Sequence, residues 1–335
     1  MAYITISREN FYHNLDQLVE KVGSIDKVAI VLKDNAYGHG LMLMAKLAHE
    51  YGIKHTVVKN MHEALQIKEL FQSVLILGDQ AIEDKKLYFA INSISALEKI
   101  ENKAQIELKL DTGMHRNGIA LEEIDRAIDI IESKNLNLKG VMTHYKSADE
   151  LSSELFWQQK NFQDAINHLR KRGVDNFRVH ACNSAATLRQ NYYCNENLVR
   201  IGISAYGYNE LADVFDKVKL KPILSLYASK VSSLALSKGS RVGYGGEGVL
   251  VQDEVVSTYD IGYGDGWLRA TKNMFIDNKT KTIGRVSMDF ISLNSDKDEV
   301  CIMSDAQKVA NYCNTISYEI LVRLSESIER VISKE

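Results

Sequence analysis

Short apolar runs alternate with amphipathic stretches from residue 7 to about residue 208, and this alternation limits the possible folds more than any other feature of the sequence. Each run is typical of a buried strand, and the stretches between the runs repeat apolar residues every three or four positions, as helices do. Strands that alternate with helices pair in parallel. Eight of them predict an α/β fold, a (β/α)8 barrel of the TIM type. The runs cover residues 27–32, 55–58, 74–77, 88–91, 106–110, 138–143, 177–180 and 198–201.

The pattern changes after Asn209. From residue 221 onward the apolar runs are short, the turns between them are rich in glycine, and one helical candidate stands out at residues 305–312. These features predict a second, mostly β domain. We place the barrel at residues 7–215 and the β domain at residues 216–335, and the strand-like run at residues 1–6 could pair into the β domain. Its expected strands are residues 223–228, 240–244, 254–259 and 282–286.

Composition narrows the classes of protein. The 41 basic and 44 acidic residues give a net charge of -3, so nucleic acid is not an expected partner. The start, MAYITISREN, becomes polar at once, and no apolar run approaches the roughly 18 residues of a membrane span. We therefore expect a cytoplasmic protein with no membrane partner. The cysteines form no C-x-x-C pair, and neither a metal site nor a disulfide framework is expected. They are Cys182, Cys194, Cys301 and Cys313.

Polar or glycine-rich segments follow five of the predicted strands. A lysine at one strand end is more often a solvated surface group than a functional one. The carboxyl ends of all strands, however, meet on one face of a parallel barrel, and five segments on that face predict a ligand site. The segments are residues 33–40, 109–116, 143–144, 180–184 and 200–203.

Two chemical functions can be assigned to these segments. Lys33 directly follows the buried run KVAIVL, and an amine in such a place can form a Schiff base with a carbonyl cofactor. Ser184 stands where a helix begins, and Gly202 and Ile203 follow the eighth strand. These residues therefore match the place, after strands seven and eight, where many barrels bind a phosphate group. A helix N-cap without any ligand is the alternative for Ser184.

Six motifs together resemble one family. K-D-N-A-Y-G-H-G after the first strand resembles the lysine motif K-A-D-A-Y-G-H-G of the alanine racemases. D-T-G-M-H-R, H-A-C-N-S-A-A, R-I-G-I-S-A-Y-G, I-G-Y-G-D-G and G-R-V-S-M-D are similar to further motifs of that family, in the family's order. The resemblance implies a homodimer that uses pyridoxal 5'-phosphate to interconvert L-alanine and D-alanine, and so supplies D-alanine for peptidoglycan in the cell wall.

The resemblance also implies a role for each matched residue. Lys33 would carry the cofactor and act as the base on one face of the substrate, and Tyr263 would be the base on the other. Arg200 would face the pyridine nitrogen; it stays protonated, so it can donate a hydrogen bond without giving up a proton. Lys109 matches a lysine that some members carry carbamylated. Further cofactor contacts would come from Tyr37, His144 (against the ring or bonded to Arg200), Ser184, Gly202, Ile203 and Tyr318, and substrate contacts from Arg116 and, across the dimer, Met288 and Asp289.

Three other functions compete with this one. A racemase of broader amino-acid specificity on the same scaffold stays open, because the sequence does not reveal the composition of the substrate pocket. A decarboxylase of the same fold would place a carboxylate at the pyridine nitrogen, and Arg200 argues against it. A non-catalytic pyridoxal-phosphate carrier would need only the barrel, and the motifs around Tyr263 and Met288 in the second domain argue against that.

Overall fold

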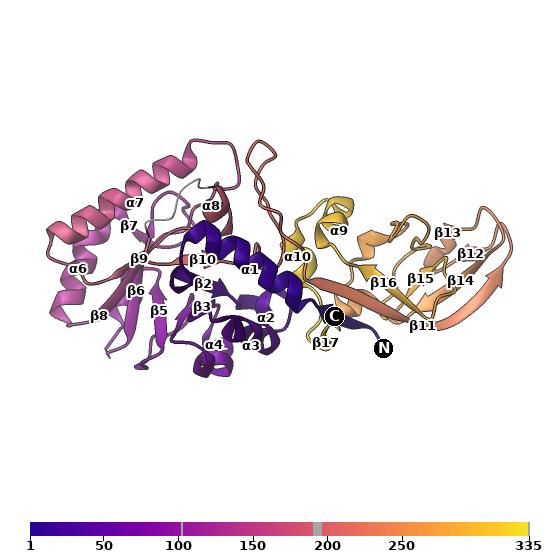
Figure 1. Ribbon diagram of the computed structural model, residues 1–335, viewed down its shortest axis with the longest axis horizontal. Coiled ribbons are helices and arrows are strands. Elements are labelled where there is room, and N and C mark those ends of the chain that lie inside the picture. Colours follow the sequence, from indigo (N-terminus) through magenta and orange to yellow (C-terminus); the bar gives the residue numbers. More distant parts are fainter. Residues whose placement is uncertain (102, 190–195, 334–335) are drawn as a thin grey trace. The chain divides into compact units, whose positions relative to one another are not determined.

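The computed structural model of the protein describes residues 1–101, 103–189 and 196–333 (Figure 1). By its internal contacts the chain divides into two compact units. One, the barrel unit, comprises Tyr12–Ala36 and Leu41–Leu220. The other, the β unit, comprises Met1–Phe11, Tyr37–Gly40 and Lys221–Glu335, so a four-residue segment from the first third of the sequence belongs to it.

The predicted barrel is confirmed: the described residues form eight parallel strands in an almost closed ring, with helices packed around them (Figure 1). The order β10-β2-β3-β4-β5-β6-β8-β9 follows the chain except at β10, which pairs with β2. The strands are β2 (Val28–Val31), β3 (His55–Val58), β4 (Ser73–Ile76), β5 (Leu87–Ile91), β6 (Gln105–Asp111), β8 (Asn137–Met142), β9 (Arg178–His180) and β10 (Val199–Ile201), with the short β7 (Ile119–Ala120) beside β6.

Between β9 and β10 the ring is joined by single backbone bonds rather than by a ladder. The N–H group of Asn197 donates to the carbonyl of Val179 (3.0 Å), and that of Arg200 donates to the carbonyl of Cys182 (2.9 Å). His180 lies on β9 and Arg200 lies on β10. The two side chains meet at this junction of the first and last strands, the seam of the barrel.

Helices complete the barrel unit and follow the amphipathic stretches closely. Three of the amphipathic stretches that separate the apolar runs, residues 40–51, 121–132 and 154–171 of the sequence, match α3, α6 and α7. Each of these helices buries one apolar face, as the three-to-four spacing predicts. The helices are α1 (Arg8–Val22), which begins in the β unit, α2 (Lys33–Tyr37), α3 (Leu41–Tyr51), α4 (Met61–Ile67), α5 (Ile94–Glu98), α6 (Ile124–Ser133), α7 (Glu154–Lys171) and α8 (Ser184–Arg189).

The β unit centres on the long strand β11 (Leu224–Leu236). The amino-terminal strand β1 (Tyr3–Ile6) pairs antiparallel with it, with Tyr3 opposite Tyr227, and the two rings stack 5.1 Å apart. The described sheet runs β15-β14-β11-β1-β17, and β16 also pairs with β11. The remaining elements are β12 (Arg241–Val242), β13 (Gly248–Val249), β14 (Glu254–Tyr259), β15 (Ile291–Leu293), β16 (Glu299–Met303), β17 (Glu329–Ile332), α9 (Ala306–Cys313) and α10 (Ser317–Val322).

Two local expectations for the β unit were wrong. The run at residues 282–286 is not a strand; it makes one isolated bridge, from Thr282 to Leu293, because Gly284 takes a left-handed φ of 70° that ends the extended backbone. The run at residues 240–244 keeps only β12 before Gly243 (φ 75°) turns the chain. The helix α10 was not expected, because six residues are too few to display helical periodicity.

Three observations bear on the excluded classes of site. No helix among the described residues combines the length and the apolar character that crossing a membrane requires. The described part of the chain contains no cluster of three potential metal-ligating acids, histidines or cysteines. Cys182, Cys301 and Cys313 form no disulfide bond in the described part of the chain, and Cys194 lies outside the described residues.

Candidate active site

Lys33 lies at the carboxyl end of β2 and opens a turn, α2, whose backbone is left-handed. Asp34, Asn35 and Ala36 have φ values of 54°, 55° and 52°. Such a conformation costs a non-glycine residue roughly 1–2 kcal/mol, so other contacts must hold it. The Asn35 N–H donates to Glu63 Oε1 (3.1 Å), and Asn35 Oδ1 accepts from the Leu41 N–H (2.7 Å). These two hydrogen bonds of Asn35, one from its backbone and one to its side chain, hold the backbone of the turn that follows Lys33.

Four cationic side chains gather around His144 in the barrel unit. Burial, and then the positive charges of Arg200, Arg116, Lys109 and Lys33 in that order of importance, together lower the pKa of His144 to about 3. The imidazole is consequently neutral at physiological pH. The structure thus brings together residues from the ends of β2, β6, β8 and β10, as the sequence predicted, and the assembled site is strongly electropositive.

Lys109 is, like Arg200, a buried member of this group. It lies on β6 with 8% of its surface exposed, and its amine donates to Asn117 Oδ1. Burial first, and then the charges of Arg116 and Arg200, lower its pKa to about 8. A substantial fraction of the amine is therefore neutral near pH 8, which is the form that reacts with electrophiles.

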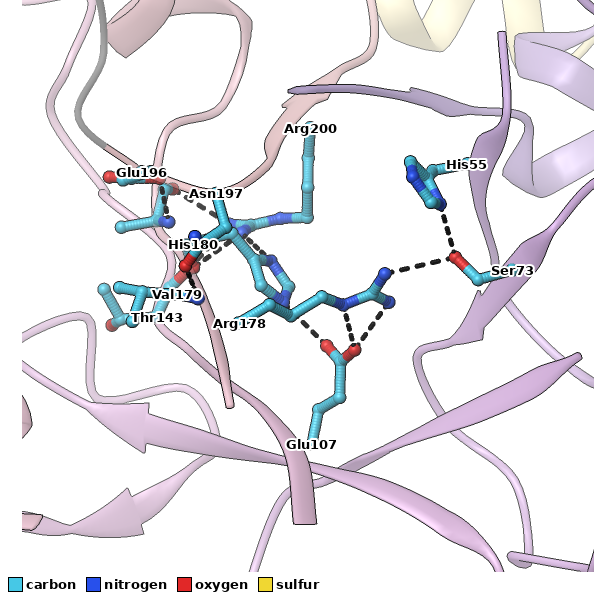
Figure 2. A network of polar contacts seen from close by, with 11 residues as sticks. His55, Ser73, Glu107, Thr143, Arg178, Val179, His180, Glu196, Asn197 and Arg200 are labelled. Carbon is cyan, nitrogen blue, oxygen red and sulfur yellow. Dashed lines mark hydrogen bonds and ion pairs between the residues drawn. The ribbon is translucent and has the colours of Figure 1, made fainter. Parts of the chain in front are cut away.

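Arg200 is almost completely buried, and four contacts hold its guanidinium group (Figure 2). Its Nη1 donates to the Nδ1 atom (2.8 Å) and the carbonyl (3.0 Å) of His180. Its Nη2 donates to the carbonyls of Thr143 (2.6 Å) and Ala181 (2.9 Å). The expected hydrogen bond between Arg200 and a histidine exists in the structure, but the partner is His180 rather than His144.

Behind His180 lies a buried ion pair that the sequence did not reveal. His180 Nε2 lies 2.6 Å from Glu107 Oε2, and Glu107 Oε1 accepts from Arg178 Nε at 2.6 Å (Figure 2). The sequence did contain a signal for each residue. Glu107 lies two positions before Lys109 on β6, so the two side chains point to the same side of that strand. His180 is the first residue of the H-A-C-N-S motif. A buried strand rarely contains a glutamate without a partner.

The corner between α8 and β10 fits an anion. Ser184 Oγ accepts from the backbone N–H groups of Gly202 (2.9 Å) and Ser204 (3.4 Å). The hydroxyl of Ser204, which the sequence did not single out, is buried with no hydrogen-bond partner among the described residues. Asn183 rather than Ser184 caps α8, since its Oδ1 accepts from the Ala186 N–H (2.9 Å). The hydroxyl of Ser184 is thereby available to this corner, where Ile203 is also buried.

Tyr37 and Tyr318 come together within the β unit. Their ring centroids lie 5.7 Å apart, with the rings tilted by 51°. Gly38 allows this approach: a Cβ atom there would stand 2.0 Å from the carbonyl oxygen of Leu321 in α10. The carbonyl of Gly38 also accepts from Arg330 Nε (2.9 Å), so the Tyr37–Gly40 segment is anchored to the end of the chain.

The two motifs of the β unit form a second local group. The N–H of Tyr263 donates to the carbonyl of Ser287 (3.0 Å), and the N–H of Gly264 donates to that of Met288 (2.8 Å). A Cβ atom at Gly262 would lie 2.1 Å from the Met288 carbonyl oxygen, so only glycine fits there. Tyr263 and Met288 are 44% and 55% exposed, and Asp289 beside them is exposed as well. The backbone therefore couples Tyr263 to the Met288 segment.

Comparison with known proteins identifies the fold family. Residues 6–210 match the family model "Alanine racemase, N-terminal domain", and residues 223–332 match "Alanine racemase, C-terminal domain". The chain belongs to the alanine racemase family. The resemblance read from the motifs is thus confirmed over both domains.

Individual alanine racemases agree with the family assignment. The chain is 46% identical to that of Nitratiruptor sp. (98% of this chain, 99% of the relative) and 40% identical to that of Campylobacter jejuni subsp. doylei (99% and 100%). Among solved structures, an alanine racemase of Clostridium difficile superposes with a TM-score of 0.90 at 26% identity (99% and 95%). That of Bacillus anthracis, with bound L-Ala-P, also gives 0.90, at 28% identity (99% and 95%).

Proposed function

We propose that this protein interconverts L-alanine and D-alanine with pyridoxal 5'-phosphate as cofactor, as a homodimer, and thereby supplies D-alanine for peptidoglycan. Membership of the alanine racemase family over the whole chain supports the reaction. The single structural observation that carries the proposal is the cationic site in which Lys33, Arg116 and Arg200 surround a neutral His144. Such a site suits an anionic cofactor and a substrate carboxylate.

The residues present fit the proposed cofactor. The Ser184 hydroxyl, whose oxygen accepts from the N–H groups of Gly202 and Ser204, can donate its own hydrogen to a phosphate, as can the orphaned Ser204 hydroxyl, and Ile203 lies beside them. Tyr37 and Tyr318 would add phenolic hydroxyls, and His144 would lie against the ring. When bound, the cofactor supplies an electron-withdrawing ring that stabilises negative charge at the substrate's α-carbon. Lys33 would hold it covalently.

Arg200 would face the ring nitrogen of the cofactor. Its guanidinium group is protonated at any useful pH and donates to three carbonyls and to His180, so it can give a hydrogen bond but cannot transfer a proton. A partner of this kind limits how strongly the ring withdraws electrons. That restraint favours return of the proton to the α-carbon over side reactions at the cofactor.

Inversion at the α-carbon needs one base on each face of the substrate. We assign one face to the amine of Lys33 and the other to the phenol of Tyr263. Proton transfer by a well-placed group of this kind contributes roughly 10²–10⁴-fold in rate. In the proposed homodimer Tyr263, Met288 and Asp289 act in the partner's site, and Arg116 holds the substrate carboxylate or orients Tyr263. A carbamate on Lys109 would give Arg116 a buried negative partner.

A chiral assay of the purified protein with L-alanine and added pyridoxal phosphate tests the function directly. We expect formation of D-alanine until both enantiomers are equal, and the same end point from D-alanine. Absence of D-alanine would refute the proposal. Parallel rates for alanine, serine and lysine decide between an alanine racemase and a racemase of broader specificity, and complementation of a D-alanine auxotroph tests the cell-wall role.

A further inference from the structure

Glu107 is a buried carboxylate with a complete set of partners. Its side chain is fully inaccessible to solvent, and Arg178 contacts its Oε1 with two nitrogens, Nε at 2.6 Å and Nη2 at 2.5 Å. Its Oε2 lies 2.6 Å from His180 Nε2. Burial alone would raise its pKa, but the charge of Arg178 and the contact with His180 outweigh burial and lower it. Glu107 is therefore ionised.

Arg178 is itself held from several directions. Its Nη1 donates to Ser73 Oγ (3.1 Å), which in turn lies 2.8 Å from His55 Nδ1 (Figure 2). Its guanidinium carbon also lies 4.5 Å over the ring of Tyr88. Opposite the carboxylate stands Gly140, where a Cβ atom would approach the Glu107 carboxyl carbon to 2.6 Å. The barrel thus leaves room for the carboxylate and fixes it tightly.

The donors around His180 determine its tautomer. An arginine nitrogen can only donate, so His180 Nδ1, 2.8 Å from Arg200 Nη1, must accept. The ring proton then resides on Nε2 and is donated to Glu107. Burial keeps the ring neutral, since it lowers the pKa of His180 to about 4 although Glu107 partly offsets the shift. The chain of contacts therefore has one direction, from Arg200 through neutral His180 to Glu107.

We propose that Glu107, anchored by Arg178, is a positioning residue that fixes the Nε2–H tautomer of His180 and thereby sets the orientation of Arg200 towards the cofactor ring. The proposal rests on the cofactor role proposed above for Arg200. Glu107 and Arg178 lie on β6 and β9 and do not belong to the cationic group around His144. Among the described residues, the hydrogen bonds that connect them to Arg200 pass through His180.

A merely structural ion pair would behave differently. A buried pair can often be replaced by apolar residues without loss of stability, and nothing else in the protein should then change. The third member of this network, His180, makes the difference, because the pair decides which of its nitrogens carries the proton. The test must therefore report on the tautomer and not only on stability.

Glu107→Gln changes the hydrogen-bond pattern with little change in shape. A glutamine offers one acceptor oxygen, and charged Arg178 competes for it best, so the amide NH2 faces His180 Nε2. We expect the proton of His180 to move to Nδ1. Two N–H groups then face each other, and the hydrogen bond from Arg200 Nη1 to His180 Nδ1 is lost. The kcat for alanine should fall roughly 10- to 100-fold, the range seen when outer partners of site histidines are removed, with KM nearly unchanged.

Two readouts test this on the full-length holoenzyme. Long-range ¹H–¹⁵N spectra of ¹⁵N-histidine-labelled protein report the tautomer, with the His180 signal among the nine histidines assigned by its loss in His180→Gln. Racemisation kinetics report kcat and KM. Glu98→Gln, which removes an exposed carboxylate paired with Arg126, is the matched control and should change neither readout. Glu107→Asp, which retains the charge, should restore the Nε2–H tautomer and most of the rate.

An unchanged tautomer in Glu107→Gln would overturn the proposal, whatever happens to the rate. If that variant does not fold, the double variant Glu107→Leu/Arg178→Met removes both charges and keeps the apolar volume. It should fold and, because nothing then accepts a hydrogen bond from His180 Nε2, lose the same share of kcat; wild-type kinetics from it would refute the role. Failure of the wild-type protein to racemise alanine would refute the proposed function instead, while the tautomer readout would stand.

Discussion

The barrel unit and the β unit each contribute proposed site residues, but they position them in different ways. In the barrel unit the site residues are buried and are held by contacts of their side chains. Arg200 and His180 are 5% and 0% exposed, Arg200 is hydrogen-bonded to His180, and His180 contacts the carboxylate of Glu107. In the β unit, Tyr263 and Met288 are about half exposed, and backbone bonds and close-packed glycines hold the loops that carry them.

The contrast indicates which properties each group can supply. Buried charges in a low-dielectric interior interact strongly, so the barrel group can tune the protonation of its members. An exposed phenol on a loop held by its backbone is available to a ligand or a second surface. The barrel unit therefore suits the permanent electrostatics of the site, and the β unit suits the group that must meet the substrate from outside.

The largest effect should come from Lys33. Lys33→Ala removes both the proposed cofactor attachment and one proposed base, so racemisation should fall by roughly 10⁴-fold or more. Borohydride reduction of the wild-type protein should trap pyridoxal phosphate on Lys33, and the variant should give no adduct. Lys59→Ala, which removes an exposed lysine paired with Asp34, serves as the control. An adduct on Lys109 would contradict the assignment.

Tyr263 offers the sharpest test of the division between units. Tyr263→Phe should lower kcat by roughly 10²–10⁴-fold and leave the protein folded, because the side chain is 44% exposed and the backbone holds the loop. A mixed dimer of Tyr263→Ala and Lys33→Ala chains should regain activity at one of its two sites, since only that site combines both wild-type residues. Verified mixed dimers without any recovery, or an active monomer, would break the shared-site proposal.

Backbone positioning in the β unit can be probed at Gly262. In Gly262→Ala the new Cβ would stand 2.1 Å from the Met288 carbonyl oxygen, so the two loops must separate. We expect a loss of roughly 1–3 kcal/mol in the free energy of unfolding of this unit, together with reduced kcat. Gly78→Ala is the control, because its Cβ would meet only one atom, at 4.0 Å. Equal thermal stability of the two variants would argue against tight backbone packing here.

The smallest effect concerns the acid stability of the barrel unit. His144 stays neutral down to a pKa of about 3 in the folded state, whereas an unfolded histidine titrates near 6.5. Below pH 6.5 the unfolded chain therefore binds a proton that the folded one does not, and stability falls as the pH drops from 6.5 towards 3. His144→Gln should flatten this slope by at most about 1.4 kcal/mol per pH unit in urea unfolding between pH 7 and 5. An unchanged slope would show that His144 is already protonated in the folded protein.

Local patterns were sufficient for much of this molecule. Buried runs such as Val28–Val31 and amphipathic helices such as Glu154–Lys171 show their periodicity within a few residues, so the barrel strands could be predicted to within one residue and the principal helices to within three. Strand ends then placed Lys33, Lys109 and Arg200 on one face. The order of the motifs was enough to predict the family.

Other features depend on residues that meet only in the folded chain. Glu107 and Arg178 are 71 positions apart, and neither carries a local signal that names its partner. The choice of His180 over His144 as the contact of Arg200 follows from the barrel seam, where β9 and β10 lie side by side without a ladder. Ser204 became part of the anion corner only through the direction of its backbone N–H.

The same distinction applies to the backbone. Residues 282–286 have the composition of a strand, yet the left-handed Gly284 prevents one, and no propensity reveals which φ a glycine takes. Tyr37–Gly40 follows a barrel strand in the sequence but packs with α10 in the β unit. The sequence by itself determined the periodic elements and the chemistry at the strand ends, because both depend on neighbours along the chain. Only the tertiary structure decided the partners of the buried charges and the unit to which each loop belongs, because those depend on contacts between distant residues.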